Sequence, residues 1–145
     1  MSASYPYGVG VSNVGSYQVS GIPFATSSIA APASSGTPSE VSFSDVTQRI
    51  VVSNVNTASA LRVGFSSNGI KNTNYFIIPA ATSTSTTLFP SQEFRVKVAS
   101  VFLLSHTATP TSASVFAELT NIDSNLLDRS GPTGLPNWSG SVGVG

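Results

Sequence analysis

The sequence has no cysteine and very little charge, and each shortage excludes a class of function. Without thiols the chain can form no disulfide, no thiolate zinc site and no cysteine nucleophile. Asp, Glu, Lys and Arg make up 8% of the 145 residues, and six bases balance six acids, whereas soluble domains usually carry about 25% charged residues. Because interface cores are depleted of charge, we expect neighbouring proteins to cover much of this surface. The plainer alternative is a soluble sandwich coated with Ser and Thr, since hydroxyls also stay hydrated.

Side chains that carry charge at neutral pH are also absent from both ends of the chain. The first is Glu40 and the last is Arg129. Residues 1–39 mix Gly, Ser, Ala and Pro with a few aromatic residues and show neither strand nor helix periodicity, so we predict a flexible or extended arm there and a folded domain at 40–145. The arm is either a disordered tail or a segment that orders against other subunits. It has none of the Lys/Arg runs of genome-binding arms, so no direct nucleic-acid contact is expected.

The chain offers no long apolar run. Its first residues lack the basic and apolar regions of a secretory signal. The longest nearly unbroken apolar stretch, residues 98–104, is far shorter than the roughly 20 residues of a spanning helix. We therefore expect no transmembrane segment and a protein that stays where it is made.

From residue 41 onward the pattern is that of short strands. Apolar and polar residues alternate through 61–66 with the period of two of a half-buried strand. Asn68-Gly69 then predicts a hairpin turn, because both residues tolerate positive φ. The predicted strands are 41–46, 49–55, 61–66, 75–78, 93–105 (one bent strand, or two that corner near 99–100) and 113–119, with an edge strand or loop at 80–89, a helical turn at 123–129 capped by Asp123 or Ser124, and a short strand or glycine-rich tail at 138–145. About eight strands indicate an all-β sandwich or jelly roll, and the pattern does not choose between them.

Residues suited to catalysis are few and scattered. His106 is the only histidine and follows a strand in a Thr/Pro-rich loop, with no G-x-S-x-G turn in the chain. The six acids are too dispersed for a metal site, and Glu93 and Glu118 have the pattern of solvent-facing positions rather than of opposed glycosidase carboxylates. Asn137-Trp138-Ser139 matches a glycosylation sequon. We predict a non-enzyme with no catalytic, cofactor or metal site.

Two groups of residues are candidates for a subunit interface. Composition suggests that the aromatic residues of the arm act as anchors, and that the predicted hairpin tip meets a neighbour. The candidates are Tyr5, Tyr7, Tyr17 and Phe24 in the arm, and Arg62, Asn68, Lys71 and Tyr75 around the tip. The alternative is a carbohydrate-binding sandwich, in which Trp138 and Tyr75 would stack against sugars.

Several stretches resemble one protein family. These are FSDVTQRIVV at 43–52, ALRVGFSSNGI at 60–70, NYF at 74–76, FRVKVASVFLLS at 94–105, AELTNI at 117–122 and WSGSVG at 138–143. They are similar to penton proteins, the single-jelly-roll vertex proteins of large icosahedral double-stranded DNA viruses, including chloroviruses of algae. The block at 61–69 is the most specific of them, and the resemblance extends over about two-thirds of the chain, from residue 41 to the C-terminus.

The resemblance implies a fold, a function and partners. The fold would be a single jelly-roll β-sandwich of about eight antiparallel strands with an extended N-terminal arm. Five copies would form the homopentameric capsomer at each fivefold vertex of the capsid, in contact with trimers of the major capsid protein and with minor capsid proteins. The chain would then reside in the virion, after assembly in the host cytoplasm, and the family brings no catalytic residue with it.

Overall fold

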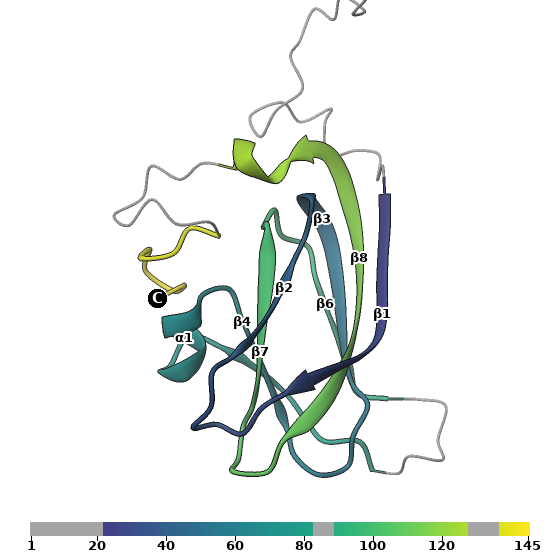
Figure 1. Cartoon of the computed structure of the whole chain (residues 1–145), viewed down its shortest axis with the longest axis vertical. Helices are drawn as coiled ribbons and strands as arrows, with labels where there is room; N and C mark the ends of the chain where they lie inside the picture. Colours follow the sequence, from purple (N-terminus) through teal and green to yellow (C-terminus); the bar gives the residue numbers. More distant parts are fainter. Residues whose placement is uncertain (1–21, 83–88, 128–136) are drawn as a thin grey trace, which may run out of the picture.

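The computed structural model describes residues 22–82, 89–127 and 137–145, and these form two antiparallel four-stranded sheets that face each other (Figure 1). The strand order is β1-β8-β3-β6 in one sheet, here sheet A, and β2-β7-β4-β5 in the other, sheet B. The strands are β1 (Ile22–Ala31), β2 (Ser39–Ser42), β3 (Asp45–Asn54), β4 (Leu61–Gly64), β5 (Phe76–Ile78), β6 (Ser91–Phe94), β7 (Ser100–Ser105) and β8 (Thr111–Asp123). The predicted all-β sandwich of about eight strands is confirmed. Consecutive strands lie in different sheets except β4 and β5, which pair directly.

The core lies between the two sheets. It consists of the side chains that point inward, which are every second residue along each strand. Val101 and Leu103 on β7 and Ile50 and Val52 on β3 are fully buried, as the period of two requires. Each such side chain stabilises the fold by about 1.5–3 kcal/mol through burial. A second, smaller cluster at one end of the sandwich contains Val46, Ala99, Ile122 and Leu127, with Trp138 packed against it.

The structure differs from the predicted arm at β1, which lies within residues 1–39 yet is an integral strand of sheet A. It pairs with β8 over most of its length, from Ile22 opposite Leu119 to Ala31 opposite Thr111. The register shifts between Thr26 and Ile29, and such a bulge changes which residues face inward. The period of two is therefore broken in the middle of the strand, which hides it from the sequence pattern. Residues 1–21 lie outside the described residues.

The predicted hairpin turn at Asn68-Gly69 is instead part of a short helix, α1 (Ser67–Lys71), which packs on the outside of sheet B against β4 and β7 (Figure 1). Ser66 caps this helix, because its hydroxyl accepts a hydrogen bond from the Gly69 amide at 2.9 Å. Glycine is needed at position 69 because another part of the backbone approaches it closely, and not because the chain turns there. A Cβ there would lie 1.9 Å from the carbonyl oxygen of Val144.

Residues 93–105 do not form one bent strand. They belong to two strands in different sheets, β6 and β7, which is the second of the two predicted alternatives. Between β6 and β7, residues 95–99 leave the regular ladder and bond to β3 at Thr47. The Thr47 amide donates to the Val98 carbonyl at 3.0 Å, and the Thr47 hydroxyl donates to the Val96 carbonyl at 2.7 Å. The segment thus continues the edge of sheet A beyond β6 and then crosses to sheet B.

The remaining segments are irregular. A 3-10 turn, η2 (Ser124–Leu126), begins after Asp123, whose carboxylate accepts from the Asn125 amide at 2.8 Å. Of the two caps predicted for the helical turn, Asp123 and Ser124, the structure has Asp123. Residues 137–145 form turns rather than a strand. Among the described residues, no helix has the length and apolar character needed to cross a membrane.

Candidate assembly surfaces

One open side of the sandwich, between the edge strands β5 and β6, is aromatic. Phe94 lies edge-to-face against Phe65 on one flank and Phe76 on the other, with ring centroids 5.9 and 5.7 Å apart. Phe76 is 47% exposed. The three rings line a pocket of about 380 Å³ together with Val63, Asn74 and Tyr75. T-shaped pairs of this kind stabilise beyond their area burial, so the rings form a fixed apolar wall.

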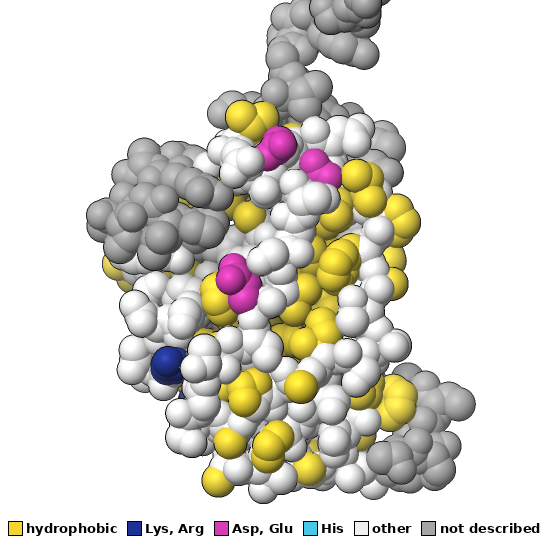
Figure 2. Space-filling model, in the orientation of Figure 1, with side chains coloured by type: hydrophobic (Ala, Val, Ile, Leu, Met, Phe, Trp, Pro, Cys, Tyr) yellow, Lys and Arg dark blue, Asp and Glu magenta, His cyan; other side chains and the backbone are white. Residues whose placement is uncertain are grey.

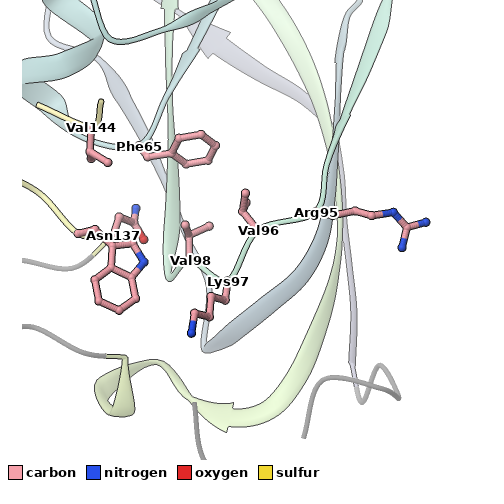
Figure 3. A pocket seen from close by; sticks show the side chains of 8 residues that line it. Phe65, Arg95, Val96, Lys97, Val98, Asn137 and Val144 are labelled. Carbon is pink, nitrogen blue, oxygen red and sulfur yellow. The ribbon is translucent and has the colours of Figure 1, made fainter. Parts of the chain in front are cut away.

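A second pocket, of about 330 Å³, continues this wall along residues 95–98. Figure 3 shows the side chains of Phe65, Val96, Val98 and Val144 converging on it, whereas Arg95 points away from it. The Lys97 ammonium lies 5.7 Å from the centroid of the Trp138 ring, which also lines the pocket. Such a placement of a cation over an aromatic face is attractive. We call this whole surface the aromatic side; it comprises Phe65, Phe76, Phe94, Val96, Lys97 and Trp138.

The pocket is held in shape by Asn137, which joins the C-terminal segment to the start of β7. Its Oδ1 accepts from the amides of Ala99 at 2.6 Å and Ser100 at 3.1 Å. Its Nδ2 donates to the Ser100 carbonyl at 2.5 Å and to the Ser100 hydroxyl at 2.7 Å. Asn137 is 1% exposed, and its φ of 61° is one that Asn adopts more readily than most residues. The sequon asparagine is therefore a buried structural clamp.

The opposite open side, between β1 and β2, is apolar and acidic. Phe24 packs edge-to-face on Phe43 at 5.1 Å, and Ile22 is 41% exposed. Figure 2 shows a hydrophobic stripe along this side, between the two sheets, with acidic side chains beside it. Glu40 lies on the edge strand β2, whereas Asp45 and Asp123 lie directly opposite each other on β3 and β8, the two inner strands of sheet A. We call this surface the acidic side; it comprises Ile22, Phe24, Glu40, Asp45 and Asp123.

The outer face of sheet A carries a network of ion pairs. Arg49 on β3 lies 2.9 Å from Glu93 on β6 and 3.0 Å from Glu118 on β8, and Glu93 also binds Arg95 at 2.9 Å. The hydrogen bond from Arg49 lowers the pKa of Glu93, and the two carboxylates raise the pKa of Arg49. Glu93 and Glu118 thus share one guanidinium, which is an arrangement for neutralising charge rather than for proton transfer to a substrate.

Outside sheet B, Arg62 holds a small polar cluster together. Its guanidinium carbon lies 4.4 Å from the centroid of the Tyr75 ring. Its Nε donates to Nδ1 of His106 at 3.2 Å, and its Nη1 donates to the Ile70 carbonyl at 3.2 Å. The only histidine therefore accepts a hydrogen bond from an arginine. Among the residues that the structure describes, no group of three His, Asp or Glu side chains is placed to hold a metal.

The structure brings together some of the interface candidates and separates others. Arg62 and Tyr75 are in contact, and Asn68 and Lys71 are exposed nearby on α1. Phe24 is half-buried on the other side of the sandwich, against Phe43, and so belongs to the core as well as to the surface. Tyr5, Tyr7 and Tyr17 lie outside the described residues.

The sequence pattern did not predict that the residues of the aromatic side, or those of the acidic side, lie together on one surface. Phe65, Phe76 and Phe94 belong to three separate segments, and only the strand order places β5 and β6 at the same edge of the sandwich. Asp45 and Asp123 are 78 positions apart and meet only through the β3–β8 register. Spacing along the chain carries no signal for either.

Comparison of the chain with protein-family models, with curated proteins and with solved structures finds no match.

Proposed function

We propose that this chain is a structural virion protein: the single-jelly-roll subunit of the pentameric capsomer at the fivefold vertices of an icosahedral capsid. The observation that carries the proposal is the pair of open apolar sides on a domain whose chain has only 8% charged residues. A soluble monomer rarely leaves large apolar patches uncovered, whereas a subunit of a closed shell has every flank against a neighbour. The resemblance of stretches within residues 43–76 and 94–105 to penton proteins is the reason for proposing the fivefold vertex in particular.

The strand order supports the jelly-roll part of the proposal. A jelly roll folds eight strands into two four-stranded sheets through two Greek keys. The orders β1-β8-β3-β6 and β2-β7-β4-β5 place the first and last strands side by side and move the chain to the other sheet at every connection except that between β4 and β5, which is compatible with such a fold. The long β8 pairs with both β1 and β3 and so lies inside sheet A.

The side chains with catalytic potential support a non-enzymatic role. His106 is bound to Arg62, and Glu93 and Glu118 are bound to Arg49. The pockets of the aromatic side are lined mainly by Phe, Val and Trp and by cations that face solvent. Such a surface is suited to packing against protein.

The direct test is the symmetry and mass of the full-length protein in solution. Native mass spectrometry should show an assembly of five 14.9 kDa subunits, and electron microscopy should show rings with a fivefold axis. A monodisperse monomer at high concentration would refute the proposal. Rings of another number would refute the vertex assignment but not the assembly role.

Trp138 gives a carbohydrate-binding function one supporting observation, because it lines the pocket of about 330 Å³. Its ring, however, packs against the smaller core cluster and has the Lys97 ammonium beside it, which leaves less aromatic face for a sugar. A glycan array decides between the functions: binding that is lost in Trp138→Ala but kept in Tyr75→Ala would establish the carbohydrate site.

A further inference from the structure

We propose that Tyr17 of one copy seats its ring in an aromatic pocket of the next copy, so that the N-terminal segment of each subunit holds its neighbour. The pocket is the one of about 380 Å³ that is lined by Phe65, Phe76 and Phe94. Tyr17 belongs to residues 1–21, which precede β1 and lie outside the described residues. The proposal rests on the self-assembly proposed above and assigns one contact to it.

The pocket is suited to a tyrosine side chain at both of its ends. Its three phenylalanine rings stand edge-to-face, and Phe76 is 47% exposed, so an incoming ring can pack on them in the same way. Asn74 and Thr73 also line the pocket, and neither side chain forms a hydrogen bond with another described residue. A tyrosine hydroxyl that becomes buried needs a polar partner, and these two groups provide one.

Strand register places the start of β1 almost level with this pocket, on the opposite flank of the domain. The edge strands β1 and β2 lie together on one flank, and β5 and β6 lie on the other. One row of paired residues crosses sheet A from edge to edge: Phe24, Ala117, Ile50 and Phe94. Ile22 precedes this row by two residues, or about 7 Å along the strand. When two copies meet edge to edge, the start of β1 in one therefore faces the pocket of the next.

Chain length selects Tyr17 among the aromatic residues that precede β1. Tyr17 lies five residues before Ile22, and an extended chain of that length spans at most about 17 Å. Such a span crosses a contact between two flanks and ends at the neighbour's pocket. Tyr5 and Tyr7 lie 17 and 15 residues before Ile22, which is far more chain than this contact requires.

The same five residues are too short to reach the pocket of their own copy. From β1 to β6 the chain would cross three strand spacings of sheet A, roughly 14 Å, clear the side chains of the outer face and then bend round β6. That path would also cover the ion pairs of Arg49 with Glu93 and Glu118 with a neutral segment, and taking ion pairs out of water is costly. The occupant is therefore the segment of a second copy.

The contact joins two neutral partners. Residues 1–21 contain no Asp, Glu, Lys or Arg, and no residue of these types lines the pocket, so docking removes no charged side chain from water. The segment leaves one flank and enters the pocket on the other, which makes the contact heterologous. Repeated contacts of this type close into a ring when the rotation between subunits allows.

The absence of cysteine allows the contact to be trapped by a single kind of disulfide. In Gln18→Cys/Thr73→Cys one thiol lies beside Tyr17 and the other lines the pocket, while Tyr17 and the three phenylalanine rings remain. Mild oxidation of this full-length variant should give a ladder of covalently joined subunits, because each disulfide links one copy to the next. The matched control, Gln18→Cys/Ala108→Cys, moves the second thiol to the exposed connection between β7 and β8 and should give almost none.

Three results of the trapping experiment would overturn the proposal. These are a disulfide within one chain, which would place the segment on its own copy, equal ladders in the two variants, and no ladder in either.

The strength of association gives an independent test. Tyr17→Ala should raise the dissociation constant of the full-length assembly about tenfold or more, and Phe76→Ala should raise it by a similar factor. Because both changes remove the same contact, the double variant should be no weaker than the weaker single variant. Tyr5→Ala and Ile77→Ala are the matched controls, since Ile77 is 42% exposed beside Phe76 but does not line the pocket; each should change the constant by less than about threefold.

Circular dichroism checks the fold of each variant. Losses that add in Tyr17→Ala/Phe76→Ala, or equal losses in the controls, would contradict the assigned contact.

The length of the ladder separates this contact from the proposed function. A ladder that ends at five subunits supports both. A ladder that ends at another number supports the Tyr17 contact and refutes the vertex assignment. Wild-type pentamers together with no ladder in Gln18→Cys/Thr73→Cys refute the contact and leave the vertex function standing. A wild type that is monomeric at high concentration refutes both.

Discussion

The side chain of Asn137 should hold the C-terminal segment on the sandwich, and Asn137→Ala tests how strongly it does so. The substitution removes four hydrogen bonds and leaves the amides of Ala99 and Ser100 and the carbonyl of Ser100 without these partners. Both residues are buried, at 7% and 2% exposure. The change therefore strips partners from backbone groups that have little access to water.

The size of the effect follows from those groups. A buried polar group that loses its partner costs about 1–3 kcal/mol, and the neighbouring pocket admits water that partly replaces the bonds. We take each of the three groups in the lower half of this range, at about 1–2 kcal/mol, which gives about 3–6 kcal/mol. Alanine at a φ of 61° adds about 1 kcal/mol of backbone strain. A total of about 4–7 kcal/mol is a large share of the 5–15 kcal/mol that stabilises a typical domain.

The assay is thermal unfolding at one fixed protein concentration, since self-association makes Tm depend on concentration. For a chain of this length, about 3 °C per kcal/mol converts the estimate to a fall in Tm of roughly 10–20 °C. Asn137→Gly should be less destabilised than Asn137→Ala, because glycine removes the backbone strain but not the lost bonds. Asn72→Ala is the matched control: it loses one exposed bond, to the Asn68 carbonyl, and should change stability by less than about 1 kcal/mol.

Two results would refute this reasoning. A Tm for Asn137→Ala within about 3 °C of the wild type would mean that the C-terminal segment contributes little to the folded state. Equal losses in Asn137→Ala and Asn72→Ala would mean that the burial of the bonds, on which the estimate depends, has no effect.

Three further predictions follow from the core, the ion pairs and the sequon. Leu103→Ala, at a fully buried position, should lower the free energy of unfolding in denaturant by about 2–5 kcal/mol. Phe65→Ala, at a half-buried position beside the pocket, should lower it by less. A larger loss for Phe65→Ala than for Leu103→Ala would contradict the assigned core. Arg49 lowers the pKa of Glu93 below its ordinary value of 4.5. This pair should therefore stabilise the fold at neutral pH and cease to do so as the pH falls below about 4.5. An acid-unfolding curve as steep in Glu93→Gln as in the wild type would count against this prediction. Folded protein treated with an oligosaccharide-transferring enzyme and its donor should keep an unmodified mass at Asn137, since this residue is buried and its amide nitrogen is bonded. A glycan there would show that the clamp opens.

The sequence predicted the strands whose periodicity is uninterrupted. Phe94, Val96 and Val98 turn inward while the residues between them face solvent, because a period of two is a local property of an extended chain. β1 was missed because its bulge between Thr26 and Ile29 shifts the inward set by one position. Local pattern therefore recovers regular strands and loses those that a tertiary constraint bends.

The helix α1 shows a different limit. Asn-Gly favours a hairpin turn when nothing else acts on it, but here Gly69 is fixed by the Ser66 cap and by the C-terminal segment passing over it. That segment is 75 positions away in the chain. The identity of the residue was informative, but the reason for it lies in a contact that sequence spacing does not reveal.

The arrangement of the few charges links the fold to the proposed assembly. Four of the ten charged residues that the structure describes form the network around Arg49, where opposite signs cancel. The three carboxylates of the acidic side remain together without a cation from the described residues, although a sandwich of this size has room to separate them. In an isolated domain such grouping only adds repulsion, which salt screens within about 8 Å. A neighbouring protein that supplies a cation would offset this repulsion, whereas contact between two acidic sides would add to it, so a chain with little charge can still favour one kind of neighbour at this surface.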